Sequence, residues 1–154
     1  MRYSNPKYKI MKTKVSKTLE AIFARTAFDL LKADIRHSYK DHLAVELLRN
    51  DTSLAYNILS LLLSPREIEW IATHICTQIE RSPIPETLPI DEYLLLYRSY
   101  LAEQFAYHNK LSTIHLLIDI CSENVSATAQ TLERYDINSC LIRDKFNSII
   151  PHSV

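Results

Sequence analysis

The chain has 154 residues, equal numbers of basic and acidic side chains (18 of each), and no glycine. Its hydrophobic content of 47% is typical of one globular domain, which excludes a fully disordered chain and a membrane-embedded bundle. The absence of glycine excludes the P-loop, the dinucleotide-binding G-x-G-x-x-G turn and the G-x-S-x-G nucleophile elbow, because each needs backbone geometry that only glycine adopts readily.

The same absence favours helices over strands. Tight hairpin turns usually recruit Asn-Gly, Asp-Gly or Gly-Gly, and none of these pairs occurs in the chain. Helices lose stability through glycine and can end without it, so a chain rich in Leu, Ile, Ala, Glu and Lys predicts an all-α fold. Start and stop signals divide the sequence into about eight helices.

The N-terminal segment, residues 1–15, is basic, since it carries Arg2, Lys7, Lys9, Lys12 and Lys14 and no acid. We interpret it as a poorly ordered head; the alternatives are an arm for nucleic acid or an acidic partner, and a segment that folds onto a groove beside the first helix. No signal-peptide pattern follows it, and no apolar run is long enough to span a bilayer. Three widely spaced cysteines predict reduced thiols and a cytoplasmic protein.

A first helical repeat is expected over residues 16–81. Ser16 is placed to cap a long first helix, and Ser38 or Asp41 opens a short second one. A third helix follows a polar break rich in capping residues. The clearest boundary is the segment Ser64–Glu67, which supplies a cap, a proline at the first helical position and a glutamate three residues after the cap. It predicts a fourth helix that ends near residue 80.

Residues 82–90 form the predicted linker, because three of the six prolines fall within this stretch and cannot propagate a helix. A second helical repeat is expected over residues 91–149, with a long helix that begins near Asp91 and three further helices. The order of helix lengths, which is long, short, medium and medium, is the same in both halves. We treat residues 16–149 as one domain.

The two halves align with each other when residues 18–64 are placed on residues 91–137. This alignment gives six identities in 47 pairs, against about three expected from composition. The matched positions fall at equivalent places in the helix pattern, and a His-Leu pair opens the short second helix of each half. The sequence therefore predicts two pseudo-symmetric four-helix repeats.

Four stretches carry a resemblance to a known family. His108–Leu117 is similar to a histidine-containing loop followed by Thr-x-x-His-Leu-Leu, and Leu132–Asn138 is similar to Leu-Glu-x-Leu-Gly-Val-Asp. Asp41–Leu48 matches the motif of the family's second helix, and Leu54–Leu59 matches Val-Ala-x-x-Val-Leu. The chain thus resembles the Clp N-terminal domain, the double-repeat helical domain at the front of Clp-type AAA+ unfoldases.

This resemblance implies a chaperone-type module that binds substrate or adaptor proteins and passes them to an AAA+ unfoldase or disaggregase. The clients of such modules are misfolded proteins, substrates of a Clp protease, or the contracted sheath of a type VI secretion machine. The chain has no Walker motif, so the motor is either the rest of a longer product or a separate partner. At the turns between the third and fourth helices, Leu63 and Asp136 stand where the family usually keeps glycine.

The histidines invite hypotheses about metal or acid-base chemistry. His74 and Cys76 offer two soft ligands, but a structural zinc site needs four, so we expect no metal. His115 and Asp119 lie one helical turn apart and could form a hydrogen bond, but nothing supplies a nucleophile with an oxyanion hole, so we expect no catalytic residues. We interpret the residues of the repeat motif as structural: His42, Leu43, Leu59, His115, Leu116 and Leu132.

Tyrosine gives a richer signal, because Tyr93, Tyr97, Tyr100 and Tyr107 lie on one predicted helix at spacings of four, three and seven. Core filling is one interpretation of this stripe. A partner-binding face is the other, since tyrosine combines a large apolar ring with a polar tip and is enriched at interfaces. The candidate protein-binding residues are Ile10, Met11, Ile22, Phe23, Tyr93, Tyr97 and Tyr100.

The sequence thus predicts a non-catalytic protein-binding module that needs no cofactor, with protein partners rather than nucleic acid or membrane. The mechanism would be docking of a helix or an extended peptide into an apolar groove. The alternative is an unrelated helical ligand-binding protein or enzyme with a histidine-containing pocket.

Overall fold

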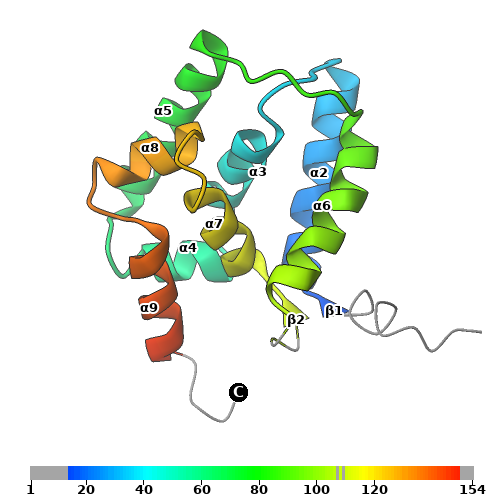
Figure 1. Ribbon diagram of the computed structural model, residues 1–154. Helices are drawn as coiled ribbons and strands as arrows, with labels where there is room; N and C mark the ends of the chain where they lie inside the picture. Colours follow the sequence, from blue (N-terminus) through cyan, green and yellow to red (C-terminus); the bar gives the residue numbers. More distant parts are fainter. Residues whose placement is uncertain (1–13, 107, 109, 150–154) are drawn as a thin grey trace, which may run out of the picture.

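The computed structural model describes residues 14–106, 108 and 110–149. The all-α prediction is confirmed, because the described residues form eight helices and only two strands, each of two residues. Figure 1 shows their arrangement. The elements are β1 (Lys14–Val15), α2 (Lys17–Lys32), α3 (Tyr39–Leu48), α4 (Leu54–Leu59), α5 (Pro65–Arg81), α6 (Ile90–Gln104), β2 (Lys110–Leu111), α7 (Thr113–Cys121), α8 (Ala127–Glu133) and α9 (Ser139–Ile149).

The helix starts lie where the capping residues predict them. The side chains of Ser16, Ser53 and Ser126 accept hydrogen bonds from backbone amides of α2, α4 and α8. Ser64 and Glu67 form both hydrogen bonds of the capping box at the start of α5. These bonds satisfy amides that have no partner inside the helix, which fixes where each helix begins.

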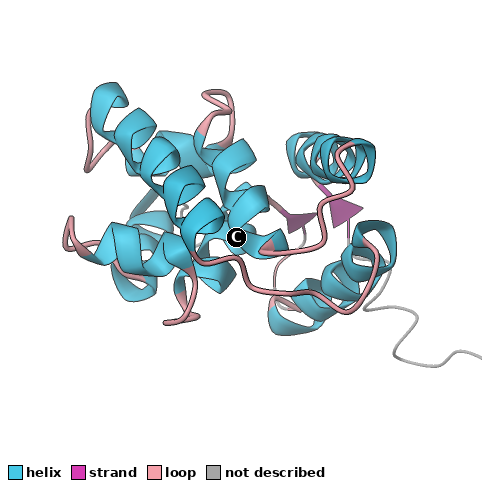
Figure 2. Ribbon diagram, turned by 90° about the horizontal axis from the view of Figure 1, so that it is seen from above, coloured by secondary structure: helices cyan, strands magenta, loops and turns pink. Residues whose placement is uncertain are grey.

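The two halves of the chain repeat one another in space. In chain order, α2, α3, α4 and α5 are equivalent to α6, α7, α8 and α9, and the equivalent helices begin at matching points of the sequence alignment. The packing follows the same symmetry: α3 contacts α5 as α7 contacts α9, and α5 contacts α8 as α9 contacts α4. The long helices α2 and α6 pack on each other along one side of the molecule, which Figures 1 and 2 show from two directions.

The core lies around α3 and α7, which contact each other at the centre of the fold. All nine residues of α7 are buried, and the leucines of the repeat motif, Leu43, Leu59, Leu116 and Leu132, have no exposed surface. Burying such a leucine contributes about 2 kcal/mol to stability relative to leaving it exposed. The repeat motif is therefore a packing motif.

Each central helix also caps a helix of the other half. The Asp41 carboxylate on α3 accepts hydrogen bonds from the backbone amides of Ala127 and Thr128 at 3.2 and 3.0 Å, and from the Thr128 hydroxyl at 2.7 Å. In the opposite direction, the Thr113 hydroxyl on α7 accepts from the backbone amide of Ala55 at 3.0 Å. These crossed caps join the two repeats into one unit.

The segments that lead into α2 and α6 pair with the other half in a related way. β1 pairs with β2 in parallel, and the amide of Ser16 donates to the carbonyl of Leu111 at 2.8 Å. The linker before α6 instead forms an antiparallel bridge between Pro85 and His37, just before α3. The sequence does not predict the two short strands, because such a short strand has no periodicity to read.

The chain makes left-handed turns without glycine. Among the described residues Asp34, Ser38 and Asp136 have positive φ angles of 54°, 52° and 60°. Aspartate tolerates this conformation better than most residues, because its short side chain forms local hydrogen bonds. Asp136 stands at a turn where the resemblance predicts glycine; Leu63, its equivalent in the first half, does not have a positive φ.

Candidate functional site

Three tyrosines of the predicted stripe, Tyr93, Tyr97 and Tyr100, form a continuous row of aromatic rings along α6. The fourth, Tyr107, comes after the last residue of α6 and lies outside the described residues. Tyr93 and Tyr97 have ring centroids 5.6 Å apart, and Tyr97 and Tyr100 have centroids 6.2 Å apart. Tyr39 at the start of α3 extends the row, with its ring edge-on to Tyr93 at 5.0 Å. Because the spacings of four and three residues keep side chains on one helical face, the sequence pattern and the observed row agree.

Exposure changes sharply along this row. Tyr97 is 4% exposed and belongs to the core, whereas Tyr100 is 46% exposed and its neighbour Leu96 is 63% exposed. Beside them is a pocket of about 380 Å³ between α6, the linker and the start of α3. We call this surface the tyrosine groove; its residues are Lys40, Glu86, Thr87, Leu88, Tyr93, Leu96, Tyr97 and Tyr100.

A charged cluster adjoins the groove at Lys40. The Lys40 ammonium forms ion pairs with Asp119, at 3.3 Å from Oδ2, and with Glu123. The Tyr97 hydroxyl donates to the same Oδ2 atom of Asp119 at 2.5 Å. Lys40 also lies over the rings of Tyr97 and Tyr100, 5.0 and 5.9 Å from their centroids. The lysine thus connects the aromatic row to two carboxylates of the second half.

These contacts determine which groups carry charge at neutral pH. Burial raises the pKa of the Tyr97 hydroxyl well above its usual value, and the Asp119 carboxylate raises it further, so the hydroxyl stays protonated and acts as a donor. Burial alone would lower the pKa of Lys40, but hydrogen bonding and attraction to Glu123 and Asp119 outweigh it and raise the pKa. The ammonium therefore stays charged, and neither group is suited to act as a base near pH 7.

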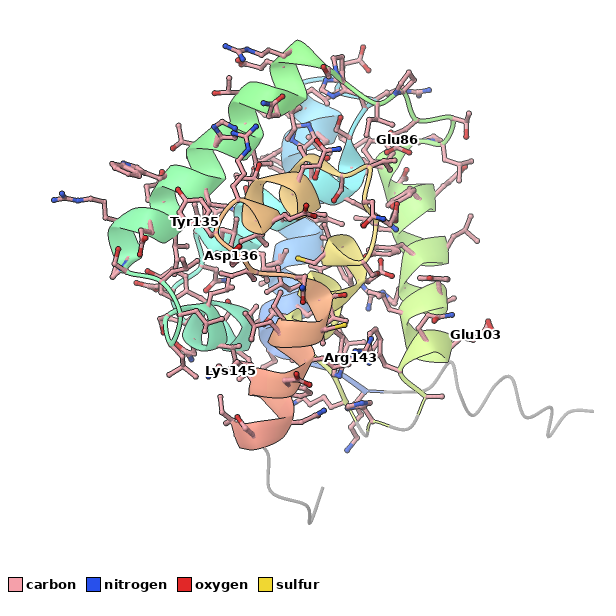
Figure 3. All side chains as sticks on the ribbon, turned by 60° about the vertical axis from the view of Figure 1, so that its left-hand side comes forward. Glu86, Glu103, Tyr135, Asp136, Arg143 and Lys145 are labelled. Atoms are coloured by element: carbon pink, nitrogen blue, oxygen red, sulfur yellow. The ribbon has the colours of Figure 1, made fainter. Side chains whose placement is uncertain are left out.

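The linker forms the other edge of the groove. The Tyr39 hydroxyl donates to the carbonyl of Leu88 at 2.6 Å, and the Tyr39 amide donates to Oε2 of Glu86 at 3.1 Å. Ser38 and Ile84 exchange two further hydrogen bonds, which hold the linker against α3. Figure 3 shows Glu86 beside the start of α6 and Glu103 near its other end. The linker is thus a fixed wall of the groove.

Glu86 sits in surroundings with an excess of negative charge. Burial raises the pKa of its carboxyl group; the Tyr39 amide and Lys40 partly offset this, while the carboxylates of Glu123 and Asp41 raise it further. One lysine faces three acidic side chains here, since Glu86, Asp119 and Glu123 all lie around Lys40. An additional positive charge placed at the groove would be stabilised.

The other predicted binding residues do not belong to this surface. Ile22 and Phe23 are 3% and 2% exposed, so in this structure they pack in the core. Phe23 lies under the Arg98 guanidinium, which pairs with Glu20 and helps to join α6 to α2. The apolar periodicity of α2 therefore marks the face of the helix that packs in the core. Ile10 and Met11 lie outside the described residues.

The histidines of the repeat motif have packing environments. Nδ1 of His115 accepts from the amide of Ser112 at 2.9 Å and completes a capping box, so the possible bond to Asp119 is not formed. Its ring packs against Phe105 and His108 at centroid distances of 4.6 Å. In the first half His42 packs against His37 at 5.4 Å. Burial lowers the pKa of both His42 and His115 to about 4, so both rings are neutral at pH 7.

Candidates for other chemistry are few among the described residues. No group of three or more His, Cys, Asp or Glu is placed there to hold a metal ion. Burial raises the pKa of the Cys121 thiol to about 12, so it is not an activated nucleophile. His74 contacts Arg134 rather than a carboxylate, with Nη1 and Nε2 3.1 Å apart.

Sequence reasoning missed Lys40, Glu86 and Leu96 as parts of the groove, and it missed Glu123 as a partner of Lys40. The ion pair between Lys40 and Glu123 joins residues 83 positions apart, and no local pattern reports such a contact. The one feature of the sequence that could have drawn attention to Lys40 is its position two residues before the His-Leu motif.

Comparison of the chain with protein-family models, with curated proteins and with solved structures gives no match. Within the part of the chain that the structure describes, no helix has the length and apolar content needed to cross a bilayer. The function must therefore be argued from the groove itself.

Proposed function

We propose that this protein is a non-catalytic binding module that captures a segment of a partner protein in the tyrosine groove. The observation that carries the proposal is the combination of Leu96 and Tyr100, 63% and 46% exposed, with a pocket of about 380 Å³ held by a hydrogen-bonded linker. Exposed aromatic and aliphatic side chains around a preformed pocket are typical of the centre of protein interfaces.

The charges around the groove define the chemistry of the partner. An apolar side chain of the partner fits against Leu96 and Tyr100, and a Lys or Arg beside it fits the acidic surroundings of Glu86. Complementary charge of this kind contributes to specificity and to the association rate. The partner segment is therefore expected to combine one apolar residue with one basic residue.

The order of the helices and their two-fold packing support a role like that of a Clp N-terminal domain. In that role the module works in the cytoplasm, and the captured protein passes to an AAA+ unfoldase ring, which is part of the same product or a separate partner. The client is a misfolded protein, a substrate of a Clp protease, or a type VI secretion sheath. Nucleic acid does not fit this groove, because its nearby charge is acidic.

The first experiment selects ligands from a displayed library of short random peptides and measures synthetic copies of the enriched ones. The proposal predicts enriched peptides with an apolar residue next to Lys or Arg. Leu96→Ala or Tyr100→Ala should weaken binding by about tenfold or more. Leu31→Ala is the matched control, because Leu31 on α2 is 56% exposed and is not one of the groove residues. Equal peptide binding by the unchanged protein and by all three variants would overturn the proposal.

A second experiment tests the unfoldase role separately. The chain replaces the N-terminal domain of a well-characterised AAA+ unfoldase, and a fluorescent reporter carries a selected peptide. The role predicts faster loss of reporter fluorescence than with the truncated unfoldase alone, and the gain should disappear with Tyr100→Ala. If the peptide binds but unfolding does not accelerate, the module binds proteins for another purpose.

A further inference from the structure

A second pocket, separate from the tyrosine groove, lies between α5 and α8. It has a volume of about 440 Å³, which lies in the range of sites for small molecules. Four residues of α5 and three at the end of α8 form it. We call it the tryptophan pocket; its residues are Trp70, Thr73, His74, Thr77, Thr131, Arg134 and Tyr135.

The charge of this pocket is opposite to that of the groove. Arg134 is its charged residue, and no carboxylate of the described residues lies within ion-pair distance of the guanidinium. Nη1 of Arg134 lies 3.1 Å from Nε2 of His74. Because a guanidinium only donates, this contact offers Arg134 no negative charge. The positive charge of Arg134 is therefore not compensated.

One carboxylate of α5, that of Glu69, already has partners. Glu69 on α5 pairs with Arg49 at 3.1 Å and accepts from the Thr73 hydroxyl at 3.2 Å. The pocket between α2 and α3 differs in charge, because three acidic residues line it: Asp29, Glu46 and Asp51. Among the described residues, those that line the tryptophan pocket include no acidic one.

The second feature of the pocket is aromatic. Trp70 is the only tryptophan of the chain, and it is 61% exposed although it is the largest apolar side chain available for the core. Tyr135, partly buried against the core, lines the same pocket, and Figure 3 shows it where the end of α8 faces α5. Exposed aromatic faces beside an arginine are suited to a flat ring that carries negative charge.

We propose that the tryptophan pocket binds a small aromatic anion, that is, an aromatic ring bearing a carboxylate or a phosphate. The ring packs on Trp70 and Tyr135. The anionic group pairs with the guanidinium of Arg134, which matches carboxylate and phosphate oxygens with two parallel N–H donors. Thr131 and His74 are further polar residues of the same lining.

Trp70 provides the readout, because its emission reports on this pocket alone. The protein is titrated with phenyl phosphate and with benzoate, and with phenol and inorganic phosphate as controls. We expect a saturable change with at least one aromatic anion. Phenol should bind about tenfold more weakly, because it lacks the charge-assisted pair. If neither aromatic anion binds at millimolar concentration, or if phenol or inorganic phosphate binds equally well, the proposal is wrong.

Variants locate the site. Arg134→Gln should weaken binding of the aromatic anion by about tenfold or more, and Arg134→Lys by less, because lysine keeps the charge but loses the paired donors. Arg143→Gln is the matched control, since Arg143 lies on α9, over the ring of Phe105. Shifts of the amide signals of Thr73 and Thr131 check the location without fluorescence. Equal affinity of Arg134→Gln and the unchanged protein would contradict the assignment.

Discussion

The two long helices α2 and α6 occupy equivalent places in the two repeats, but they carry different side chains on one face. The positions equivalent to Tyr93, Tyr97 and Tyr100 on α6 are Glu20, Ala24 and Ala27 on α2. Both helices pack against each other and against the central helix of their own half. The aromatic row is therefore not something that the repeat needs in order to fold.

The comparison separates residues shared for packing from residues specific to one half. Leu43 and Leu116 are equivalent and both fully buried, as are Leu59 and Leu132. Tyr100, at the exposed end of the aromatic row, has in contrast only Ala27 at the equivalent position of the first repeat. A feature that only one repeat carries, and that reaches the surface, points to binding rather than to packing.

The largest effect is expected at the crossed caps, where the halves also differ. Asp41 accepts three hydrogen bonds at the start of α8, whereas Thr113 accepts one at the start of α4. Asp41→Ala leaves buried donors without partners and should lower the free energy of unfolding by about 3 kcal/mol, against about 1 kcal/mol for Thr113→Ala. Urea unfolding measures both. Equal losses would show that the two caps are equivalent.

The two equivalent histidines, His42 and His115, should make the stability of the fold depend on pH. Burial lowers the pKa of His115 from about 6.5 to about 4 in the folded protein. Between these values the unfolded chain binds a proton that the folded chain does not, so stability is complete above pH 6.5 and falls as the pH decreases towards 4. His115, 2% exposed, should contribute about 3 kcal/mol of this loss.

His115→Gln tests this dependence, because glutamine can keep the capping box without titrating in this range. The variant should have a flatter stability profile between pH 6.5 and 4 in urea unfolding. His42→Gln is the matched change in the first half, where burial lowers the pKa to about 4 as well. An unchanged slope in both variants would exclude the histidines as the cause.

A smaller effect is expected at the buried end of the aromatic row. Tyr97→Phe removes the hydrogen bond to Asp119 and should reduce the free energy of unfolding by about 1.5 kcal/mol. Tyr93→Phe is the control, because its hydroxyl forms no hydrogen bond to another described side chain or backbone group, and its effect should stay within about 0.5 kcal/mol. A loss of equal size in both would mean that the pairing with Asp119 does not stabilise the fold.

The smallest effect on stability is expected at the exposed end. Leu96→Ala and Tyr100→Ala should each change the free energy of unfolding by less than about 0.5 kcal/mol, because the two residues are 63% and 46% exposed. Thermal unfolding checks this. A large loss in either variant would place the residue in the core and remove the argument for binding.

Local chemistry makes most of the fold predictable. The capping box at Ser64 and Glu67 marks its helix directly, and the alignment of residues 18–64 with residues 91–137 relates the two halves from the sequence alone. The face shared by the groove tyrosines is also predictable, because helical spacing by itself places them together.

The remaining features depend on contacts between distant parts of the chain. Asp41 caps a helix 87 residues away, and Lys40 reaches Asp119 and Glu123 in the other repeat. The apolar pattern of α2 does not distinguish a packing face from a binding face, so it predicts Ile22 and Phe23 as binding residues although the core buries them. Contacts between the repeats, and the choice between a packing face and a binding face, depend on how the helices pack.

The central claim is that α6, and not its equivalent α2, presents the binding surface. Amide hydrogen exchange with and without a selected peptide tests it most directly. We expect added protection at Leu96, at Tyr100 and in the linker at Glu86, with no change on the exposed face of α2 around Phe28. Protection confined to α2, or spread equally over both long helices, would contradict it.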